Sequence, residues 1–174
     1  MIAKRIRLPS TKSSMWPPER ENPGPSLTLK TLGPQRTADE VDPLPPKVNL
    51  EASLSDLTAP AAATGATTAV RVSGVEGLPQ HVVALVWRVA QEAVRNATRH
   101  ANADSLTVSV RREPGTVVLE VLDDGTGFRP DERPADTSFG LRGLASLVDE
   151  HGGKLEVRSM PGQGTTVRLE VGDT

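Results

Sequence analysis

The sequence contains no cysteine and very few aromatic residues, which narrows its chemistry before any motif is considered. Without cysteine in 174 residues, disulfide bonds, a thiol nucleophile and a cysteine zinc site are excluded. The three histidines, His81, His100 and His151, are far apart in the sequence, which disfavours a histidine metal site. Aromatic residues make up only 2%, so a core must consist of Val, Leu and Ala, enough for one small domain.

Long apolar runs and a strong net charge are also missing. The longest apolar run, residues 82–87, is far too short to cross a bilayer. Residues 1–14 are basic but contain no apolar segment of the kind that a secretory signal requires. The net charge of −2 indicates no particular partner. We therefore expect a cytoplasmic protein with no membrane segment and no nucleic-acid partner.

The first part of the chain differs from the rest in charge and in proline content. Residues 1–36 hold seven Lys and Arg and two acidic residues, a net charge of +5, and nine of the 15 prolines precede Lys47. Proline removes a backbone donor and disfavours helix at the residue before it. Because large apolar residues are also few, we expect residues 1–46 to be a disordered basic arm. Residues 47–66 are rich in small residues, and we expect a linker there.

An ordered domain is expected over residues 67–172, with the element order β-α-β-β-loop-α-β-β. Alternation of apolar and polar residues predicts five strands, at residues 67–72, 105–113, 116–124, 154–160 and 165–171. Helical periodicity predicts an amphipathic helix over residues 80–101 and a second helix over residues 141–151. These elements predict a two-layer α/β sandwich, in which helices cover one face of a mixed, mostly antiparallel sheet.

Three polar residues on the first helix form a candidate site. Glu92, Asn96 and His100 are each four residues apart, so all three lie on one side of the helix. Mg²⁺ takes oxygen ligands and keeps several waters, so an Asn together with substrate phosphates is a suitable ligand set. Taken alone, however, the triplet fits an ordinary solvated helix face better.

Three glycine-containing segments follow in the sequence. Asp123 ends an apolar strand and begins the segment DDGTG, which suits either a base-binding carboxylate or a simple hairpin turn. The segment GLRG at residues 140–143 opens the second predicted helix, where free N–H groups would suit a phosphate. The segment GQGT at residues 162–165 is a turn between two strands. None of the three is a P-loop, because no Gly-Lys-Ser/Thr occurs.

Each motif is weak alone, but the four occur in one fixed order that resembles the catalytic ATP-binding domain of sensor histidine kinases. That domain belongs to the GHKL ATPase group, which includes the gyrase and MutL ATPases. The segment RVAQEAVRNATRHANA resembles the N box of the nitrate-sensor and desaturase-regulator kinase subgroup. DDGTGF resembles the G1 box, GLRGL the G2 box and PGQGT the last glycine-rich box. The resemblance implies a Bergerat-type ATP-binding fold and a phosphotransferase of a two-component phosphorelay.

The resemblance also implies how the adenine would be held. Asp123 would bind the adenine amino group, and Thr165 would support the adenine side of the pocket. Gly125 and Gly127 would shape the pocket floor.

At the phosphate end, the resemblance implies that Asn96 holds Mg²⁺. Glu92 would act beside it, polarising water or supporting the ion, and is the expected catalytic residue. Arg99 and His100 would approach the phosphates. A short ATP lid at residues 126–139 would be hinged by three residues of the G2 box, which are Gly140, Leu141 and Gly143.

The sequence departs from the resembled family in two respects. After the G2 box the subgroup usually has a Met-Arg-Glu-Arg-like run, whereas residues 144–147 are LASL. No dimerising helical hairpin precedes residue 67, and none of His81, His100 and His151 fits a phosphoacceptor. The expected partners are therefore a histidine-bearing dimerisation domain, or a cognate kinase or response regulator acting in trans. A truncated kinase and a stand-alone module both fit these expectations.

Two other functions remain open from the sequence. An anti-sigma-factor-type serine kinase has the same fold and the same N and G1 boxes, and is similarly short. A pseudo-kinase interaction module would keep the motifs without using them.

Overall fold

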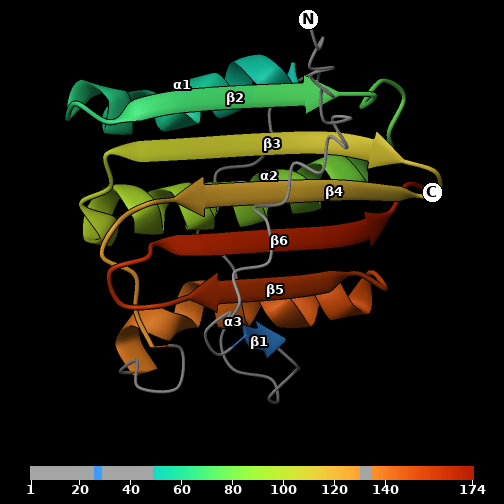
Figure 1. Ribbon diagram of the computed structural model, residues 1–174. Helices are drawn as coiled ribbons and strands as arrows, with labels where there is room; N and C mark the ends of the chain where they lie inside the picture. Colours follow the sequence, from blue (N-terminus) through green and yellow to red (C-terminus); the bar gives the residue numbers. More distant parts are fainter. Residues whose placement is uncertain (1–25, 29–48, 130–134) are drawn as a thin grey trace, which may run out of the picture.

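The computed structural model describes residues 26–28, 49–129 and 135–174, which form a sheet layer and a helix layer (Figure 1). The strands are β1 (Ser26–Thr28), β2 (Thr67–Ser73), β3 (Ser105–Glu113), β4 (Thr116–Asp123), β5 (Lys154–Ser159) and β6 (Thr165–Gly172). The helices are α1 (Leu50–Ala63), α2 (Gln80–Asn96) and α3 (Ala135–Glu150), and a π-helical turn, Ala97–Ala101, continues α2.

The sheet has six strands in the order β1-β5-β6-β4-β3-β2. β2 and β3 pair in parallel, and the other four pairs are antiparallel. The three helices lie behind one face of this sheet (Figure 1). The predicted two-layer α/β sandwich is therefore confirmed, as are the two predicted hairpins, β3–β4 and β5–β6.

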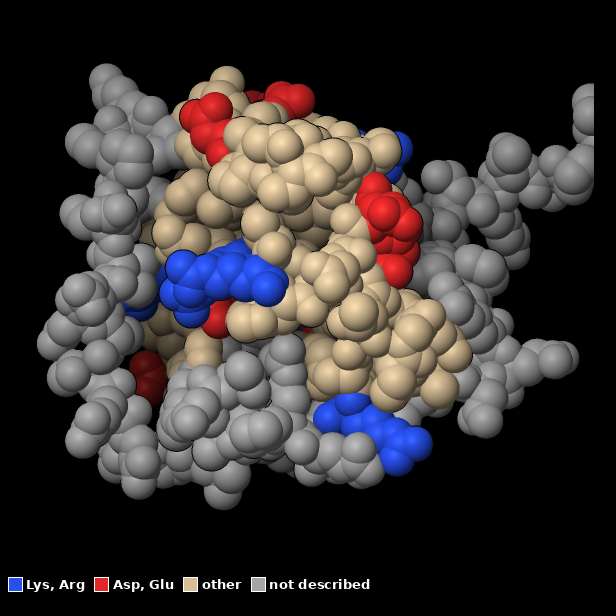
Figure 2. All heavy atoms as spheres, turned by 90° about the vertical axis from the view of Figure 1, so that its left-hand side faces the viewer, with Lys and Arg blue, Asp and Glu red and all other residues tan. Residues whose placement is uncertain are grey.

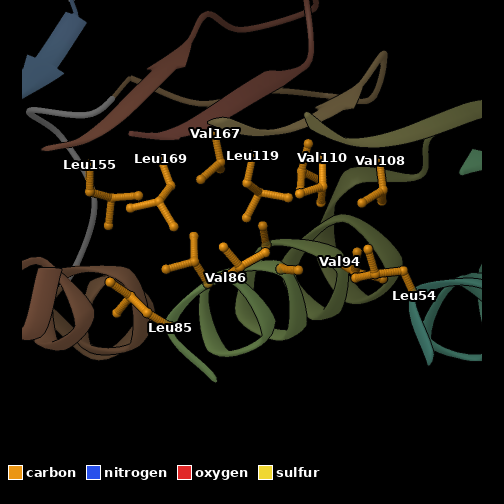
Figure 3. Close-up of a cluster of buried hydrophobic side chains, with 14 of the residues drawn as sticks. Leu54, Leu85, Val86, Val94, Val108, Val110, Leu119, Leu155, Val167 and Leu169 are labelled. Carbon is orange, nitrogen blue, oxygen red and sulfur yellow. The ribbon is translucent and has the colours of Figure 1, made fainter. Parts of the chain in front are cut away.

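The core lies between the two layers, because alternate strand residues face the apolar side of α2. Leu119 on β4 and Leu169 on β6 are fully buried, as are Val86 and Val94 on α2. In Figure 3 the strand side chains point toward the helices and the helix side chains point back toward the sheet. Burying one such side chain contributes about 1.5–3 kcal/mol, so this layer contact stabilises the fold and fixes α2 against the sheet.

The linker expected at residues 47–66 is wrong, because most of it forms α1. Asn49 caps this helix by accepting hydrogen bonds from the N–H groups of Glu51 and Ala52, at 3.1 and 3.2 Å. Leu54 is fully buried, and Leu50 is 5% exposed. These leucines are four residues apart, and so narrow an apolar stripe is easily missed among small residues.

Two further boundaries differ from the expectation. Ser26–Thr28 forms β1, so the expected disorder is wrong for these three residues, and the rest of residues 1–46 lies outside the described part. α3 begins at Ala135, so the predicted loop at residues 124–139 is shorter than expected. The prediction treated Gly140 as the helix start, but a helix tolerates an internal glycine at a cost of about 1 kcal/mol. Within the described residues, no helix has the length and apolar character to span a membrane.

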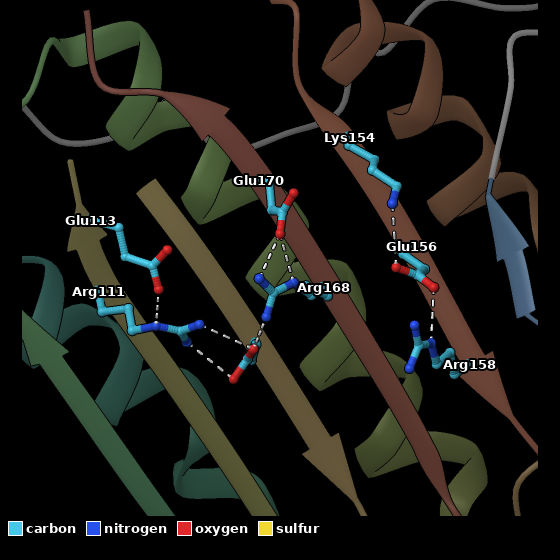
Figure 4. Close-up of polar contacts among 8 residues, drawn as sticks. Arg111, Glu113, Lys154, Glu156, Arg158, Arg168 and Glu170 are labelled. Carbon is cyan, nitrogen blue, oxygen red and sulfur yellow. Dashed lines mark hydrogen bonds and ion pairs between the residues drawn. The ribbon is translucent and has the colours of Figure 1, made fainter. Parts of the chain in front are cut away.

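The sheet face opposite the helices carries ion pairs (Figure 4). The Glu120 side chain, only 1% exposed, pairs with Arg111 on β3 and Arg168 on β6. Arg111 also pairs with Glu113, and Arg168 with Glu170. Charged side chains therefore occupy the outward positions of the alternating strands.

Candidate functional site

An open pocket lies where α2 and its π-helical turn meet the end of β4 and the beginning of β6. The empty space at this pocket, counted together with the solvent at its open side, is about 430 Å³. The lining residues come from α2, the π-helical turn, β4, β6 and the loop after β4, and they are Ala93, Asn96, Ala97, His100, Ala101, Val121, Asp123, Thr126, Gly127, Phe128, Thr165 and Val167. Figure 2 shows this side of the molecule, where most of the described surface is neither acidic nor basic.

Asp123 is the carboxylate that the structure places in this pocket. It is the last residue of β4 and lies directly opposite Thr165 on β6. The N–H of Gly125 donates to its Oδ1 at 3.0 Å. Burial raises the pKa of the Asp123 carboxyl above its ordinary value, and hydrogen bonds from Gly125 and Thr165 offset this only in part. A shielded carboxylate of this kind can accept a hydrogen bond from an amino group of a ligand.

The neighbouring Asp124 has a structural role instead. The Ser105 N–H donates to Asp124 Oδ1, and the Ser105 hydroxyl donates to Oδ2, both at 2.8 Å. These hydrogen bonds hold the pKa of the Asp124 carboxyl below its ordinary value. Of the two adjacent carboxylates, therefore, Asp123 faces the pocket and Asp124 joins the loop to β3.

Asn96 lines the pocket, and its side chain is hydrogen-bonded to Glu92, one helical turn earlier. The Asn96 Nδ2 donates to Glu92 Oε1 at 3.1 Å, which leaves the Asn96 amide oxygen as an acceptor. The other Glu92 oxygen pairs with Arg95. Glu92 is not among the residues that line the pocket. Its position fits a residue that orients Asn96 rather than one that touches a ligand.

The π-helical turn at the end of α2 determines which of its residues face the pocket. A π-helical turn contains an extra residue, and such turns are frequent at functional sites. His100 lines the pocket, whereas Arg99 is exposed and does not. The Thr126 N–H donates to the Ala101 carbonyl at 2.7 Å, and the Thr126 hydroxyl donates to the His100 carbonyl at 3.3 Å. The turn is therefore fastened to the loop after β4.

The glycines of this loop permit close packing of backbones. A Cβ at Gly125 would lie 2.3 Å from the Ala101 carbonyl oxygen, and one at Gly127 would lie 1.9 Å from the Met160 carbonyl oxygen. Gly127 also has a φ of +56°, which disfavours other residues. Gly127 lines the pocket, and Gly125 packs against its wall. Both glycines are needed because the loop touches neighbouring backbone on two sides.

The glycines of the predicted G2 box do not open a helix. Gly140 and Gly143 are the sixth and ninth residues of α3, beyond the first four N–H groups that a helix leaves unpaired. The expectation of free N–H groups for a phosphate at these positions is therefore wrong. Gly140 instead packs against Glu92, and a Cβ at position 140 would lie only 1.9 Å from the Glu92 Oε1. The side chain of Leu141 lies outside the described residues.

Ser159 is a residue near the pocket that the sequence did not identify. It is 5% exposed, and its hydroxyl bonds to the loop after β4 and to the turn before β6. The one available signal was its place in β5, where Leu155, Val157 and Ser159 alternate toward the core. A serine at such a position needs hydrogen-bond partners, but the sequence does not say which.

The described residues contain no group of three or more His, Cys, Asp or Glu side chains placed to hold a metal ion. A hard cation at this pocket would therefore need oxygens from its ligand and from water, in addition to the Asn96 amide.

Comparison with known proteins gives a consistent result. The family model described as "Histidine kinase-, DNA gyrase B-, and HSP90-like ATPase" matches residues 82–174, more than half of the chain. The signal transduction histidine-protein kinase/phosphatase DegS of Brevibacillus brevis is 32% identical over 96 residues, 55% of this chain and 25% of that protein. The oxygen sensor histidine kinase NreB of Staphylococcus carnosus (strain TM300) is 36% identical over 87 residues, 50% of this chain and 25% of that protein. The chain thus spans about a quarter of each relative.

Solved structures share the same architecture. The histidine kinase domain of the Erythrobacter litoralis EL346 blue-light activated histidine kinase matches with a TM-score of 0.56 and 26% identity, over 71% of this chain and 61% of that chain. The catalytic domain of histidine kinase ThkA matches with a TM-score of 0.54, over 72% of this chain and 92% of that chain. At 17% identity, the second likeness shows the fold alone.

Proposed function

The chain belongs to the family of histidine kinase-, DNA gyrase B- and HSP90-like ATPases, and from this premise we propose that its pocket binds ATP together with Mg²⁺. The observation that carries the proposal is the shielded carboxylate of Asp123 among the apolar pocket residues Val121, Ala97 and Val167. The apolar residues suit the flat faces of a purine, and the carboxylate suits its 6-amino group. Thr165, directly opposite, supports the carboxylate.

The phosphates would lie toward the end of α2. The Asn96 amide oxygen is a suitable Mg²⁺ ligand, because the amide nitrogen already donates to Glu92. Mg²⁺, when bound, supplies charge neutralisation to the phosphates. Glu92 holds Asn96 in place, and the exposed Arg99 and His100 are available to approach the phosphates. A lid within residues 126–139 would be hinged at three residues of α3, which are Gly140, Leu141 and Gly143.

The activity that this pocket serves is, in this proposal, transfer of the γ-phosphate to a histidine. Both relatives are histidine kinases by name, which supports transfer to a histidine. The histidine would be supplied by a dimerisation domain or a cognate kinase, with a response regulator as the next acceptor. The chain's own contribution is to orient the nucleotide and to hold its charge, which is most of what phosphoryl transfer requires.

Nucleotide binding is tested by titrating the protein with ADP and Mg²⁺ in a calorimeter, first as wild type and then as Asp123→Asn. An amide presents the adenine amino group with an NH₂ as well as an oxygen, so we expect binding to be lost. Asp124→Asn is the matched control, because that side chain faces Ser105 rather than the pocket. Unchanged affinity in Asp123→Asn, with a folded protein, would overturn the proposal.

A further inference from the structure

Ser159 lies one strand away from the pocket, at the end of a row of three residues that crosses the sheet. Ser159 on β5 is the register partner of Thr165 on β6, and Thr165 is the register partner of Asp123 on β4. All three occupy positions that face the helix layer. Asp123 and Thr165 line the pocket, whereas Ser159 does not. Directly opposed polar side chains on neighbouring strands interact through their hydroxyls.

The hydroxyl of Ser159 uses all of its hydrogen-bonding capacity. It accepts from the Phe128 N–H at 2.9 Å and donates to the Gly164 carbonyl at 2.9 Å. It also lies 3.1 Å from Thr165 Oγ1. A hydroxyl has one proton and two lone pairs, and a carbonyl can only accept. The Ser159 hydroxyl therefore donates its proton to the Gly164 carbonyl, and it accepts a hydrogen bond from the Thr165 hydroxyl.

The Thr165 hydroxyl is consequently held between two acceptors. One is the Ser159 oxygen, and the other is the carboxyl of Asp123, to which Thr165 also hydrogen-bonds. The single Thr165 proton serves one acceptor at a time, and while Ser159 takes it, the backbone N–H of Thr165 still hydrogen-bonds to the Asp123 carboxyl. Without Ser159, the Thr165 side chain would lose one of these two attachments, and Asp123 would lose a fixed neighbour.

Ser159 also joins the two loops that meet beneath the pocket. Phe128 belongs to the loop after β4, and Gly164 to the turn before β6. These loops touch again where a Cβ at Gly164 would lie 2.0 Å from the Asp123 carbonyl oxygen, and where the Gly162 N–H donates to the Thr126 carbonyl at 2.7 Å. A small movement of either loop would therefore move the carboxylate of Asp123.

We propose that Ser159 is a positioning residue for recognition of the purine 6-amino group, because its hydroxyl fixes Thr165 beside Asp123 and joins the loop after β4 to the turn before β6. This inference rests on the proposed nucleotide site and adds a residue that does not touch the nucleotide. A positioning role predicts lost discrimination between purines, whereas a purely structural role predicts lost stability and equal weakening for every purine.

The test compares ADP with purine riboside 5′-diphosphate, which lacks the 6-amino group. In Ser159→Ala we expect ADP binding to weaken about five- to tenfold, the usual effect of losing one buried hydrogen bond. Binding of the analogue should change little, so the preference for ADP should fall by the same factor. Ser109→Ala is the matched control, because Ser109 is another buried serine of the sheet but lies opposite Glu120, on the face away from the helix layer. It should leave the preference unchanged.

A double-mutant comparison separates the positioning role from general damage. In a Thr165→Val background the hydroxyl path from Ser159 to Asp123 is already broken and only the loop contacts remain, so adding Ser159→Ala should reduce the ADP preference by a smaller factor than in the wild-type background. If Ser159→Ala fails to fold, Ser159→Cys keeps the size with a weaker hydrogen-bonding group and should show an intermediate preference. Equal weakening for both nucleotides, or an unchanged preference in a folded variant, would overturn the inference. Absence of ADP binding by the wild type would instead refute the proposed function itself.

Discussion

The side-chain amide of Asn96 donates a hydrogen bond to the carboxylate of Glu92, 3.1 Å away and one turn earlier on the same helix. This contact orients the amide, because the nitrogen donates to Glu92 and the oxygen has no partner among the residues that the structure describes. The Glu92 side chain is 13% exposed and also pairs with Arg95. The pair therefore presents one oriented oxygen where the proposed Mg²⁺ would bind.

Replacing Glu92 should weaken the contribution of Mg²⁺ more than the binding of adenine. In Glu92→Ala the Asn96 amide can rotate, so we expect the gain in ADP affinity on adding Mg²⁺ to shrink about tenfold, the loss of a hydrogen bond to a charged group. Calorimetric titrations with and without Mg²⁺ measure this gain. Arg95→Ala is the control, because it removes the other partner of Glu92 and leaves Asn96 held. An undiminished gain in Glu92→Ala would contradict an orienting role.

The glycines near the pocket should respond differently to alanine. In Gly127→Ala the new Cβ would collide with the Met160 backbone at a φ of +56°, and we expect a loss of at least about 2 kcal/mol in the free energy of unfolding. Gly143 lies inside α3 with open space around it, so Gly143→Ala should stabilise the helix by about 0.5–1 kcal/mol. Denaturant unfolding gives both values. A stable Gly127→Ala protein would show that the loop can move away from Met160.

Gly143→Ala also tests the expected hinge. A helix that is merely stabilised should leave the ADP affinity as it was. A changed affinity in this variant, together with a higher unfolding midpoint, would indicate that α3 must bend when nucleotide binds.

Because alternation in strands and motif order are local signals, the sequence was sufficient for five of the six strands. It was also sufficient for five pocket residues, Asn96, His100, Asp123, Gly127 and Thr165. It was insufficient for α1, whose buried face has only two leucines, Leu50 and Leu54, and otherwise consists of the smaller Thr58 and Ala61. It also misplaced the start of α3. Position 140 requires glycine because a larger residue would collide with Glu92, and not because a helix begins there. Ser159 could not be found at all, because its partners lie in loops that come together only in the folded sheet.

The ion pairs on the opposite sheet face should affect stability without affecting the pocket. Glu120→Ala leaves Arg111 and Arg168 facing each other without the carboxylate between them, and both are about one-fifth exposed. We expect a loss of about 1–3 kcal/mol in the free energy of unfolding, because the two arginines left without their partner are partly exposed to solvent. The ADP affinity should not change. Glu113→Ala is the control, because Glu113 is 47% exposed and its pair with Arg111 should be worth at most about 1 kcal/mol. Equal effects of the two substitutions would show that burial of Glu120 adds nothing.

Acidic pH should weaken nucleotide binding through Asp123. Burial raises the pKa of this carboxyl, and its ionised form is the stronger acceptor for the adenine amino group. ADP affinity should therefore fall as the pH drops through the raised pKa, beginning above the value of about 3.9 for an ordinary aspartate.

The effect of Asp123 on stability should have the opposite sign. Because its pKa is higher in the folded than in the unfolded state, its contribution to stability is fully present below the unfolded pKa and is lost as the pH rises through the folded pKa. Hydrogen bonds from Ser105 lower the pKa of Asp124, so the contribution of Asp124 to the free energy of unfolding is lost as the pH falls. This contribution is small, because the Asp124 side chain is exposed. The ADP affinity of the wild type, and the unfolding free energies of the wild type and of Asp123→Asn, measured from pH 7 downward, isolate the contribution of Asp123. If the wild-type curve of stability against pH ran parallel to that of the variant, the pKa of Asp123 would be the same in the folded and unfolded states, which would contradict a raised pKa.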